Sequence, residues 1–309
     1  MRFKEFRKQG MLQIFALAGI LYLFIFSYIP MFGIIMGFKD YTINMGISGI
    51  FTSEWIGFKH FIDFFTDYKF SKLFWNTITL SVLKIIFTFP MPIIFAIILN
   101  EVRVLRFKRL VQTASYLPHF ISWVVVSGMI TTFFRQQNGL INEMLINLQL
   151  IETPLSFLTE SKYFLPMAVL SDIWKSTGWW GIIFLAAIVG IDPALFEAAT
   201  IDGATRIQRI FHITLPGIKP TIVVVLIMAI GGLLGGGLSG SNFEQSYLLG
   251  NPMNSDTSEI IQKYTFEVGL KQGRFAYATA VGLVQSLISV ILIYVSNFVA
   301  SKISDTSLF

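Results

Sequence analysis

Cysteine is absent from this chain of 309 residues, and charged side chains make up only 13% of it. The lack of cysteine excludes disulfides, thiolate metal sites, cysteine nucleophiles and palmitoyl anchors. The charged fraction is about half of the roughly 25% that is usual in soluble domains. Since 54% of the residues are hydrophobic, the chain lacks the polar surface of a water-soluble enzyme or nucleic-acid-binding module. The composition predicts a protein whose solvent is lipid.

Several familiar chemical motifs are also missing. No GxxxxGK[ST] sequence is present, so the chain is not expected to cradle nucleotide phosphates as a P-loop does. His60, His119 and His212 do not stand near acids at metal-ligand spacing, so no metal site is predicted. No serine lies in a nucleophile-elbow pattern. We therefore predict no catalytic constellation, and a protein that is not an enzyme.

Six apolar stretches are long enough, or nearly so, to cross a hydrocarbon core of roughly 30 Å as helices. The first stretch is longer than a signal-peptide core, and no small-residue cleavage site follows it, so we expect it to be retained. Pro90 and Pro92 are expected to kink the second stretch. We predict one all-α membrane domain over residues 1–309. Its predicted spans cover residues 11–29, 73–99, 111–134, 164–191, 218–238 and 276–300.

Lysine and arginine distinguish the two sides of this predicted membrane domain. With the amino terminus taken as cytoplasmic, the short connections on that side are rich in basic residues, and the opposite loops are longer and more acidic. The positive-inside rule therefore predicts a multi-pass protein of a bacterial cytoplasmic membrane with both termini in the cytoplasm. The same rule accounts for the net charge of +5, so nucleic acid is not an expected partner. The basic residues on the cytoplasmic side are Arg2, Lys4, Arg7, Lys8, Arg103, Arg106, Lys108, Arg109, Arg206, Arg209, Lys219 and Lys302.

The connection between the fourth and fifth spans, residues 192–217, is predicted to form two short helices on the cytoplasmic surface. Asp192 followed by Pro193 is a helix start, with a side-chain cap and a proline in the first turn. Gly203 permits a break, and an apolar stripe follows at helical spacing. Pro216 is expected to end the second helix before the next span. The stripe consists of Ile207, Ile210 and Phe211.

Small and acidic residues in this connection suggest a docking element, although a simple amphipathic connector at the interface also fits the residues alone. Glu197-Ala198-Ala199, then Gly203, then Ile213-Thr214-Leu215-Pro216 resembles the EAA signature, EAA-x3-G-x9-I-x-LP. This signature is typical of permease subunits of binding-protein-dependent ABC importers. The resemblance implies that the connection is a coupling loop for an ATPase. The implied coupling residues are Glu197, Ala198, Ala199, Asp202, Gly203, Ile213, Leu215 and Pro216.

The resemblance extends over nearly the whole chain. Within this family the chain is similar to the carbohydrate-uptake branch, particularly to LplB-type polysaccharide permeases. It rests on Thr177-Gly-Trp-Trp-Gly, Phe243-Glu-Gln-Ser-Tyr-Leu-Leu and Tyr277-Ala-Thr-Ala-Val-Gly-Leu. It implies the MetI-like fold of type I ABC importers, with six transmembrane helices and cytoplasmic coupling helices. The implied partners are a second permease, two ATP-binding subunits that hold ATP and magnesium, and an extracytoplasmic solute-binding protein. This chain itself would carry no cofactor.

Three ionisable residues fall inside the predicted spans, where a charge costs about 2.5–3.5 kcal/mol on insertion scales. Asp172 and Lys175 are three residues apart on one helical face, and the favoured interpretation is mutual neutralisation. Contact with solute, or snorkelling of Lys175 to the interface, are the alternatives. Lys84 has no acid nearby in the sequence, so it is expected to face a cavity.

Other polar and aromatic residues within the spans form a second group of substrate-pathway candidates. Trp174, Trp179 and Trp180 offer stacking on sugar rings, but an aromatic belt or helix packing is the favoured interpretation. The glycine run of residues 231–240, richer than the family leads one to expect, fits either tight helix packing or a broken helix beside a cavity. The full set of candidates is Asn76, Lys84, Asp172, Trp174, Lys175, Trp179, Asn242, Glu244 and Gln285.

The sequence therefore predicts the transmembrane permease subunit of an ATP-driven importer for an oligosaccharide. An acidic oligosaccharide is the narrower hypothesis, and it rests on Lys84 and Lys175. A permease for another small solute, such as an amino acid, is an alternative because the EAA loop reports the ATPase and not the cargo. A stand-alone secondary transporter is a second alternative, and an intramembrane enzyme, which lacks an acid, base or metal cluster, is a third.

Overall fold

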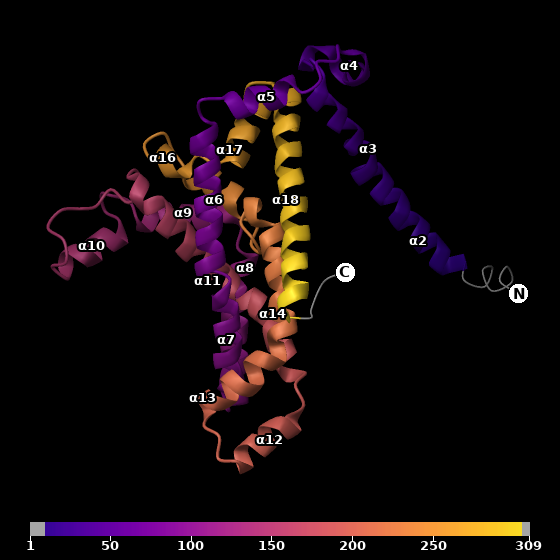
Figure 1. The fold of residues 1–309 in the computed structure, drawn as a ribbon. Coiled ribbons are helices and arrows are strands. Elements are labelled where there is room, and N and C mark those ends of the chain that lie inside the picture. Colours follow the sequence, from indigo (N-terminus) through magenta and orange to yellow (C-terminus); the bar gives the residue numbers. More distant parts are fainter. Residues whose placement is uncertain (1–9, 305–309) are drawn as a thin grey trace, which may run out of the picture. The chain divides into compact units, whose positions relative to one another are not determined.

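The computed structural model describes residues 10–304, and these residues are predominantly helical (Figure 1). No β-strand occurs among them, and one isolated bridge joins Lys39 to Trp55. The prediction of an all-α protein is confirmed. The helices are α2 (Gly10–Leu23), α3 (Ile29–Met31), α4 (Gly46–Thr52), α5 (Lys59–Thr66), α6 (Phe70–Phe87), α7 (Pro90–Glu101), α8 (Leu105–Phe120), α9 (Trp123–Phe133), α10 (Leu140–Asn147), α11 (Ser161–Val189), α12 (Pro193–Ile201), α13 (Arg206–Arg209), α14 (Leu215–Gly231), α15 (Asn242–Leu249), α16 (Ser255–Ser258), α17 (Ile261–Phe266) and α18 (Phe275–Ser304).

Four continuous helical stretches of the described chain are long and apolar enough to cross a membrane. The number rises to six when two bent pairs are each counted as one span: α8 with α9, bent by 97°, and α11 with α12, bent by 69°. Each predicted span falls on one of these six. The four continuous stretches are Gly10–Phe38, Phe70–Glu101, Arg206–Gly231 and Phe275–Lys302.

Two prolines, Pro30 and Pro216, lie inside helical stretches of the described chain. The first stretch continues past Pro30 to Phe38, and the fifth contains Pro216 near the middle of Arg206–Gly231. In each case a π-helical turn comes just before the proline, at Phe24–Tyr28 and at Ile210–Thr214. A π turn widens the helix locally, so it accommodates a residue that has no N–H to donate. The expectation that Pro216 separates the second short helix from the fifth span is wrong.

The described chain divides into two compact units, residues 69–264 with 286–304 and residues 10–68 with 265–285. In the larger unit, α7, α11 and α14 enclose one hydrophobic core, which includes Phe89, Phe184 and Ile218. A second core, which includes Leu80, Phe164 and Leu249, lies where α11 meets α6, α9 and α15. Within this unit, α12 and α16 lie at opposite ends of the long α11 (Figure 1). The expectation of one membrane domain stays a prediction.

In the smaller unit, the segment that follows α3 makes most of the contacts described next. Lys39 is buried there, and its Nζ donates hydrogen bonds to the carbonyl oxygens of Phe51 and Ser53. Phe38 stacks on Trp55 with ring centroids 5.6 Å apart. No residue of α2 is buried in this chain, although its side chains are almost all apolar. An apolar helix without a protein partner is stable only in lipid or against another subunit.

Candidate functional site

The coupling loop, residues 192–217, begins as the sequence predicts. The Asp192 side chain caps α12 by accepting a hydrogen bond from the Ala194 backbone N–H at 2.9 Å, and Pro193 occupies the first turn. Gly203 then has a φ of +75°, a left-handed conformation that only glycine and a few polar residues adopt easily. Thr205 and Gln208 form a capping box that starts α13. The break at Gly203 therefore separates two helices, each with its own cap.

The second helix of the loop is continuous with the fifth span, because α13, the π turn and α14 form one helical stretch, Arg206–Gly231. No flexible connection lies between the loop and this span. A displacement of α13 is therefore carried directly into α14, which packs in the core with α7 and α11. α12, by contrast, is not continuous with α11, because the chain bends by 69° between these two helices.

The loop exposes apolar side chains that no described residue of the chain covers. Leu195, Ile201, Ile207 and Phe211 are each more than half exposed, and Ile201 reaches 86%. Beside them lies a hollow of about 310 Å³, and small side chains form part of its wall. Exposed apolar residues around a hollow are typical of a protein interface. The hollow is lined by Ala199, Ala204, Gln208, Arg209, His212 and Ile213.

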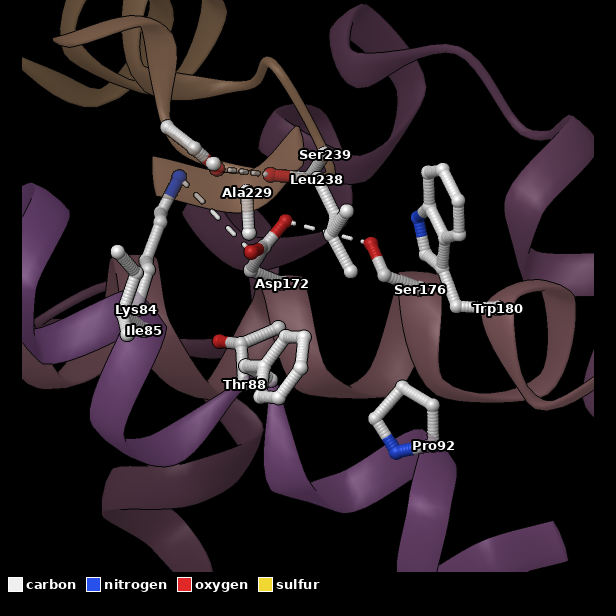
Figure 2. A pocket seen from close by; sticks show the side chains of 13 residues that line it. Lys84, Ile85, Thr88, Pro92, Asp172, Ser176, Trp180, Ala229, Leu238 and Ser239 are labelled. Atoms are coloured by element: carbon white, nitrogen blue, oxygen red, sulfur yellow. Dashed lines mark hydrogen bonds and ion pairs between the residues drawn. The ribbon is translucent and has the colours of Figure 1, made fainter. Parts of the chain in front are cut away.

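A cluster of buried polar side chains lies inside the larger unit, at the level where the fifth span breaks. Lys84 on α6 and Asp172 on α11 point toward one another, with 3.9 Å between Nζ and Oδ2 (Figure 2). Both side chains are at most 2% exposed. Ser241 accepts a hydrogen bond from Lys84 Nζ at 2.6 Å and donates one to Asp172 Oδ1 at 3.0 Å. The Ser241 hydroxyl thus lies between the two charges and bonds to both.

This arrangement corrects one sequence interpretation, the pairing of Asp172 with Lys175, whereas Lys84 does line a small cavity, as expected. Asp172 is paired with Lys84 and not with Lys175, and Lys84 has an acidic partner that lies 88 positions later in the chain. Sequence spacing on one helix could not reveal this, because the partner comes from another span. Ser176 contributes a weaker hydrogen bond to Asp172 Oδ1 at 3.4 Å, and Ser239 contacts Ser241 at 2.8 Å. The two serines at the end of the glycine run, Ser239 and Ser241, were missed as functional candidates.

The glycine run both breaks the helix and packs tightly, so the structure agrees with both interpretations left open by the sequence; a Cβ at Gly231 would lie 2.3 Å from the Ile293 side chain. α14 ends at Gly231, a short 3-10 turn follows at Leu233–Gly235, and Gly236, Gly237 and Gly240 all have positive φ. At Gly236 a Cβ would lie 2.8 Å from Asn242 Oδ1, so any side chain there would collide. The run therefore needs glycine for its backbone conformation and for close packing.

Lys175 fulfils a different role from the one predicted. Its Nζ donates to the backbone carbonyl oxygens of Pro118, His119 and Ile121, at 3.1, 2.6 and 2.5 Å. These carbonyls lie at the carboxyl end of α8, where the chain bends by 97° into α9. A cation at a helix carboxyl terminus satisfies carbonyls that have no intrahelical partner. Gly178, one turn later on α11, allows the close approach, since a Cβ there would collide with the Ser115 carbonyl.

Replacing Lys175 with methionine is expected to lower the free energy of unfolding by about 3 kcal/mol, because three carbonyls at the bend, one buried and two partly buried, would lose their donor. The measurement is the thermal unfolding midpoint of the detergent-solubilised protein. Lys162→Met is the matched control, since the Lys162 side chain is 65% exposed and its ion pair with Glu160 is at the surface. Equal midpoints for the two variants would contradict this role of Lys175.

Of the remaining substrate-pathway candidates, Asn242 and Glu244 lie beside the cluster, at the start of α15, where Asn242 Nδ2 donates to Ser81 Oγ on α6 at 2.9 Å. The others lie elsewhere. Asn76 donates hydrogen bonds to the carbonyls of Asp256 and Glu259, a structural role in the amino-terminal half of α6. Trp174 is 45% exposed beside an apolar groove, and Trp179 stacks on His119 with centroids 4.4 Å apart. Buried polar atoms that lack a hydrogen-bond partner among the described residues include Asn242 Oδ1, Glu244 Oε2, Gln245 Oε1 and Gln285 Nε2.

None of the three histidines belongs to a metal site in the described chain, where no group of three or more metal-binding side chains comes together. His60 contacts the Lys39 carbonyl at 3.2 Å, and His119 stacks on Trp179. His212 donates to the Gln208 carbonyl at 2.9 Å and lines the hollow of the coupling loop.

Membrane-length helices, a capped and exposed EAA loop and a buried polar cluster at a broken span define a transport permease. Residues 88–305 match the model of the family described as the binding-protein-dependent transport system inner membrane component. The chain belongs to this family of ABC transporter permease components, which are not themselves enzymes. It is a multi-pass protein of the cell membrane.

Similar proteins match the chain along almost its full length. Protein LplB of Bacillus subtilis is 42% identical over 98% of this chain and 92% of its own. The polygalacturonan/rhamnogalacturonan transport system permease protein YteP of the same organism is 42% identical over 98% of this chain and 91% of its own. A crystal structure of a bacterial ABC transporter involved in the import of the acidic polysaccharide alginate contains a chain that is 38% identical, with a TM-score of 0.87, covering 98% of this chain and 99% of that one. The MetI-like fold of type I importers is therefore the fold of this chain.

Proposed function

We propose that this permease serves a binding-protein-dependent, ATP-driven importer whose cargo is an acidic oligosaccharide. The observation that carries the proposal is the similarity, over at least 98% of the chain, to the alginate transporter chain and to YteP. The coupling loop supports the ATP-driven part of the proposal, because its exposed apolar residues and its hollow provide a surface for a cytoplasmic partner.

The proposed assembly contains a second permease of the same fold, two ATP-binding subunits and an extracytoplasmic solute-binding protein. ATP and magnesium would be bound by the ATP-binding subunits, and this chain would hold no cofactor. The alginate transporter has been solved in complex with its alginate pentasaccharide-bound periplasmic protein, which supports the solute-binding partner. Both termini would face the cytoplasm, as the coupling loop would. The basic residues Arg2, Lys4, Arg7 and Lys8, on which this orientation partly rests, lie outside the described residues.

The proposed mechanism is a switch between two rigid arrangements of the spans. Closure of the ATPase pair would move α12 and α13 together. α13 would transmit this movement directly to α14, since the two helices belong to one continuous helical stretch. α14 packs against α7 and α11, so the cavity between the spans would change its access from one side of the membrane to the other. The proposed coupling contacts are those of the EAA loop around Glu197 and Gly203.

In this conformation the two lysines on which the sequence hypothesis rested are not free to recognise the charge of the cargo. In this structure Lys84 is paired with Asp172, and all three donors of Lys175 are used on backbone carbonyls. Neither ammonium group is available to a carboxylate in this conformation. Trp174 and Trp179 keep exposed surface, at 45% and 37%, and stay proposed contacts for sugar rings.

The test is uptake by the assembled importer in proteoliposomes. We expect transport that requires ATP and the binding protein, and that is inhibited by oligosaccharides with carboxylates but not by neutral oligosaccharides of the same length. Inhibition by the neutral series alone would refute an acidic cargo, and amino-acid transport would refute a carbohydrate cargo. Solute flux through this chain alone, without ATP, would identify a secondary transporter.

A further inference from the structure

The glycine run at the end of the fifth span contacts the rest of the larger unit through two leucines, Leu234 and Leu238, and through the hydroxyls of Ser239 and Ser241. Residues 232–241 contain one 3-10 turn and three residues with positive φ, so few helical hydrogen bonds hold the segment in place. Ser241 bonds to both members of the Lys84–Asp172 pair, and Ser239 bonds to Ser241 and to the Gly236 carbonyl. A glycine-rich backbone of this kind can change conformation at low cost.

The buried ion pair depends on this segment. At 3.9 Å, Lys84 Nζ and Asp172 Oδ2 are too far apart for a hydrogen bond, and the 2.6 Å hydrogen bond of Lys84 goes to Ser241. A buried pair repays the desolvation of its charges only when hydrogen bonds satisfy them as well. With Ser241 removed from its place, the two charges would need water. The position of the segment and the hydration of the pair are therefore linked.

The segment also forms one wall of a small cavity, which is lined by apolar side chains together with a few polar groups. A space of about 20 Å³ lies beside the ion pair and is walled by α6, α11 and residues 236–239 of the segment (Figure 2). Such a volume holds about one water molecule and no sugar ring, since ligand pockets measure about 300–1,000 Å³. Thr88 lines the same space from the break between α6 and α7, and its Oγ1 is buried without a hydrogen-bond partner. Water in an enlarged cavity would satisfy this hydroxyl.

We propose that residues 232–241 form an intramembrane gate, and that Lys84, Asp172 and Ser241 form the latch that holds it shut. In the closed state Ser241 bridges the two charges. In the open state the segment withdraws, the cavity fills with water, and the ion pair becomes accessible to the hydroxyl groups of a passing solute. The proposal of a gate rests on the proposed transport function. In it, the role of the two buried charges is to hold residues 232–241 in position.

The absence of cysteine makes the gate directly measurable, because any introduced thiol is the only one in the chain. Thr88→Cys places a small thiol on the cavity wall opposite the segment and removes no hydrogen bond to another side chain. The full chain is assembled with its partner subunits in membranes and treated with a water-soluble maleimide. We expect slow labelling in the otherwise unchanged chain, and labelling at least tenfold faster when Ser241→Ala or Lys84→Met with Asp172→Met is added.

Two controls distinguish gate opening from loss of the fold. Lys72→Gln neutralises an ion-paired lysine on the same helix, α6, but at a half-exposed site, and it should leave the labelling rate unchanged. Ala96→Cys places the thiol in the α7–α11–α14 core, where it should stay protected in every background. Equal labelling of Thr88→Cys with and without the latch would overturn the proposal. Faster labelling at both thiol positions would also overturn it, because the latch would then stabilise the whole unit. Labelling needs neither ATP nor oligosaccharide, so this result is independent of the uptake experiment.

Discussion

Replacing Asp172 with alanine is expected to lower the free energy of unfolding by about 3–5 kcal/mol, because Lys84 would be left as an unpaired buried charge. Lys84 is 2% exposed and lies on α6, away from any alternative acid at ion-pair distance in the described chain. The thermal unfolding midpoint of the detergent-solubilised protein measures the effect. Purified yield from membranes should fall together with the midpoint.

Two further variants show whether charge is the cause. Lys84→Met combined with Asp172→Met removes both charges and should recover most of the lost stability, since apolar replacement of a buried ion pair is often neutral or stabilising. Lys72→Gln, which breaks a half-exposed pair with Asp256, should change stability by no more than about 1 kcal/mol. A double variant as unstable as Asp172→Ala would show that side-chain packing, and not the unpaired charge, is responsible.

Replacing Gly203 with valine is expected to reduce the ATPase that co-purifies with this chain more than tenfold, and to reduce uptake in proportion. Gly203 has a φ of +75°, where a β-branched residue is strained by about 1–3 kcal/mol. No atom lies within 4 Å of the position a Cβ would take, so the effect comes from the backbone conformation and not from a clash. The strained loop would no longer hold α12 and α13 in the relative orientation that the partner binds.

Gly203→Asn is the matched control, because asparagine tolerates the left-handed conformation while adding a side chain of similar size. It should keep most of the bound ATPase. Glu197→Ala removes an exposed carboxylate on α12 without changing the backbone. Loss of bound ATPase in this variant would therefore report a direct contact of Glu197, and not a change in loop geometry. If Gly203→Val binds ATPase as well as Gly203→Asn does, the shape of the break has no part in docking.

The sequence interpretation that pairs Asp172 with Lys175 is wrong for one physical reason. Helical spacing places Asp172 and Lys175 on one face, but a side chain pairs with whatever the neighbouring helices bring closest. At the level of Asp172 the neighbour is Lys84 on α6 together with Ser241, and at the level of Lys175 it is the carboxyl end of α8. The 97° bend of α8 into α9 exposes carbonyls that only a tertiary donor satisfies. No periodicity in the sequence encodes that donor.

The sequence by itself determined the solvent of this protein, the positions of its six apolar stretches and the start and break of its coupling loop. These features depend on local properties: hydrophobic length, the cap at Asp192 and the left-handed backbone at Gly203. Only the tertiary structure decided that the second loop helix is continuous with the fifth span, that the glycine run is a broken helix, and that Lys84, Asp172 and Ser241 form one cluster. Those features depend on contacts between residues up to 157 positions apart, which satisfy buried charge and open backbone groups that the local chain leaves without partners.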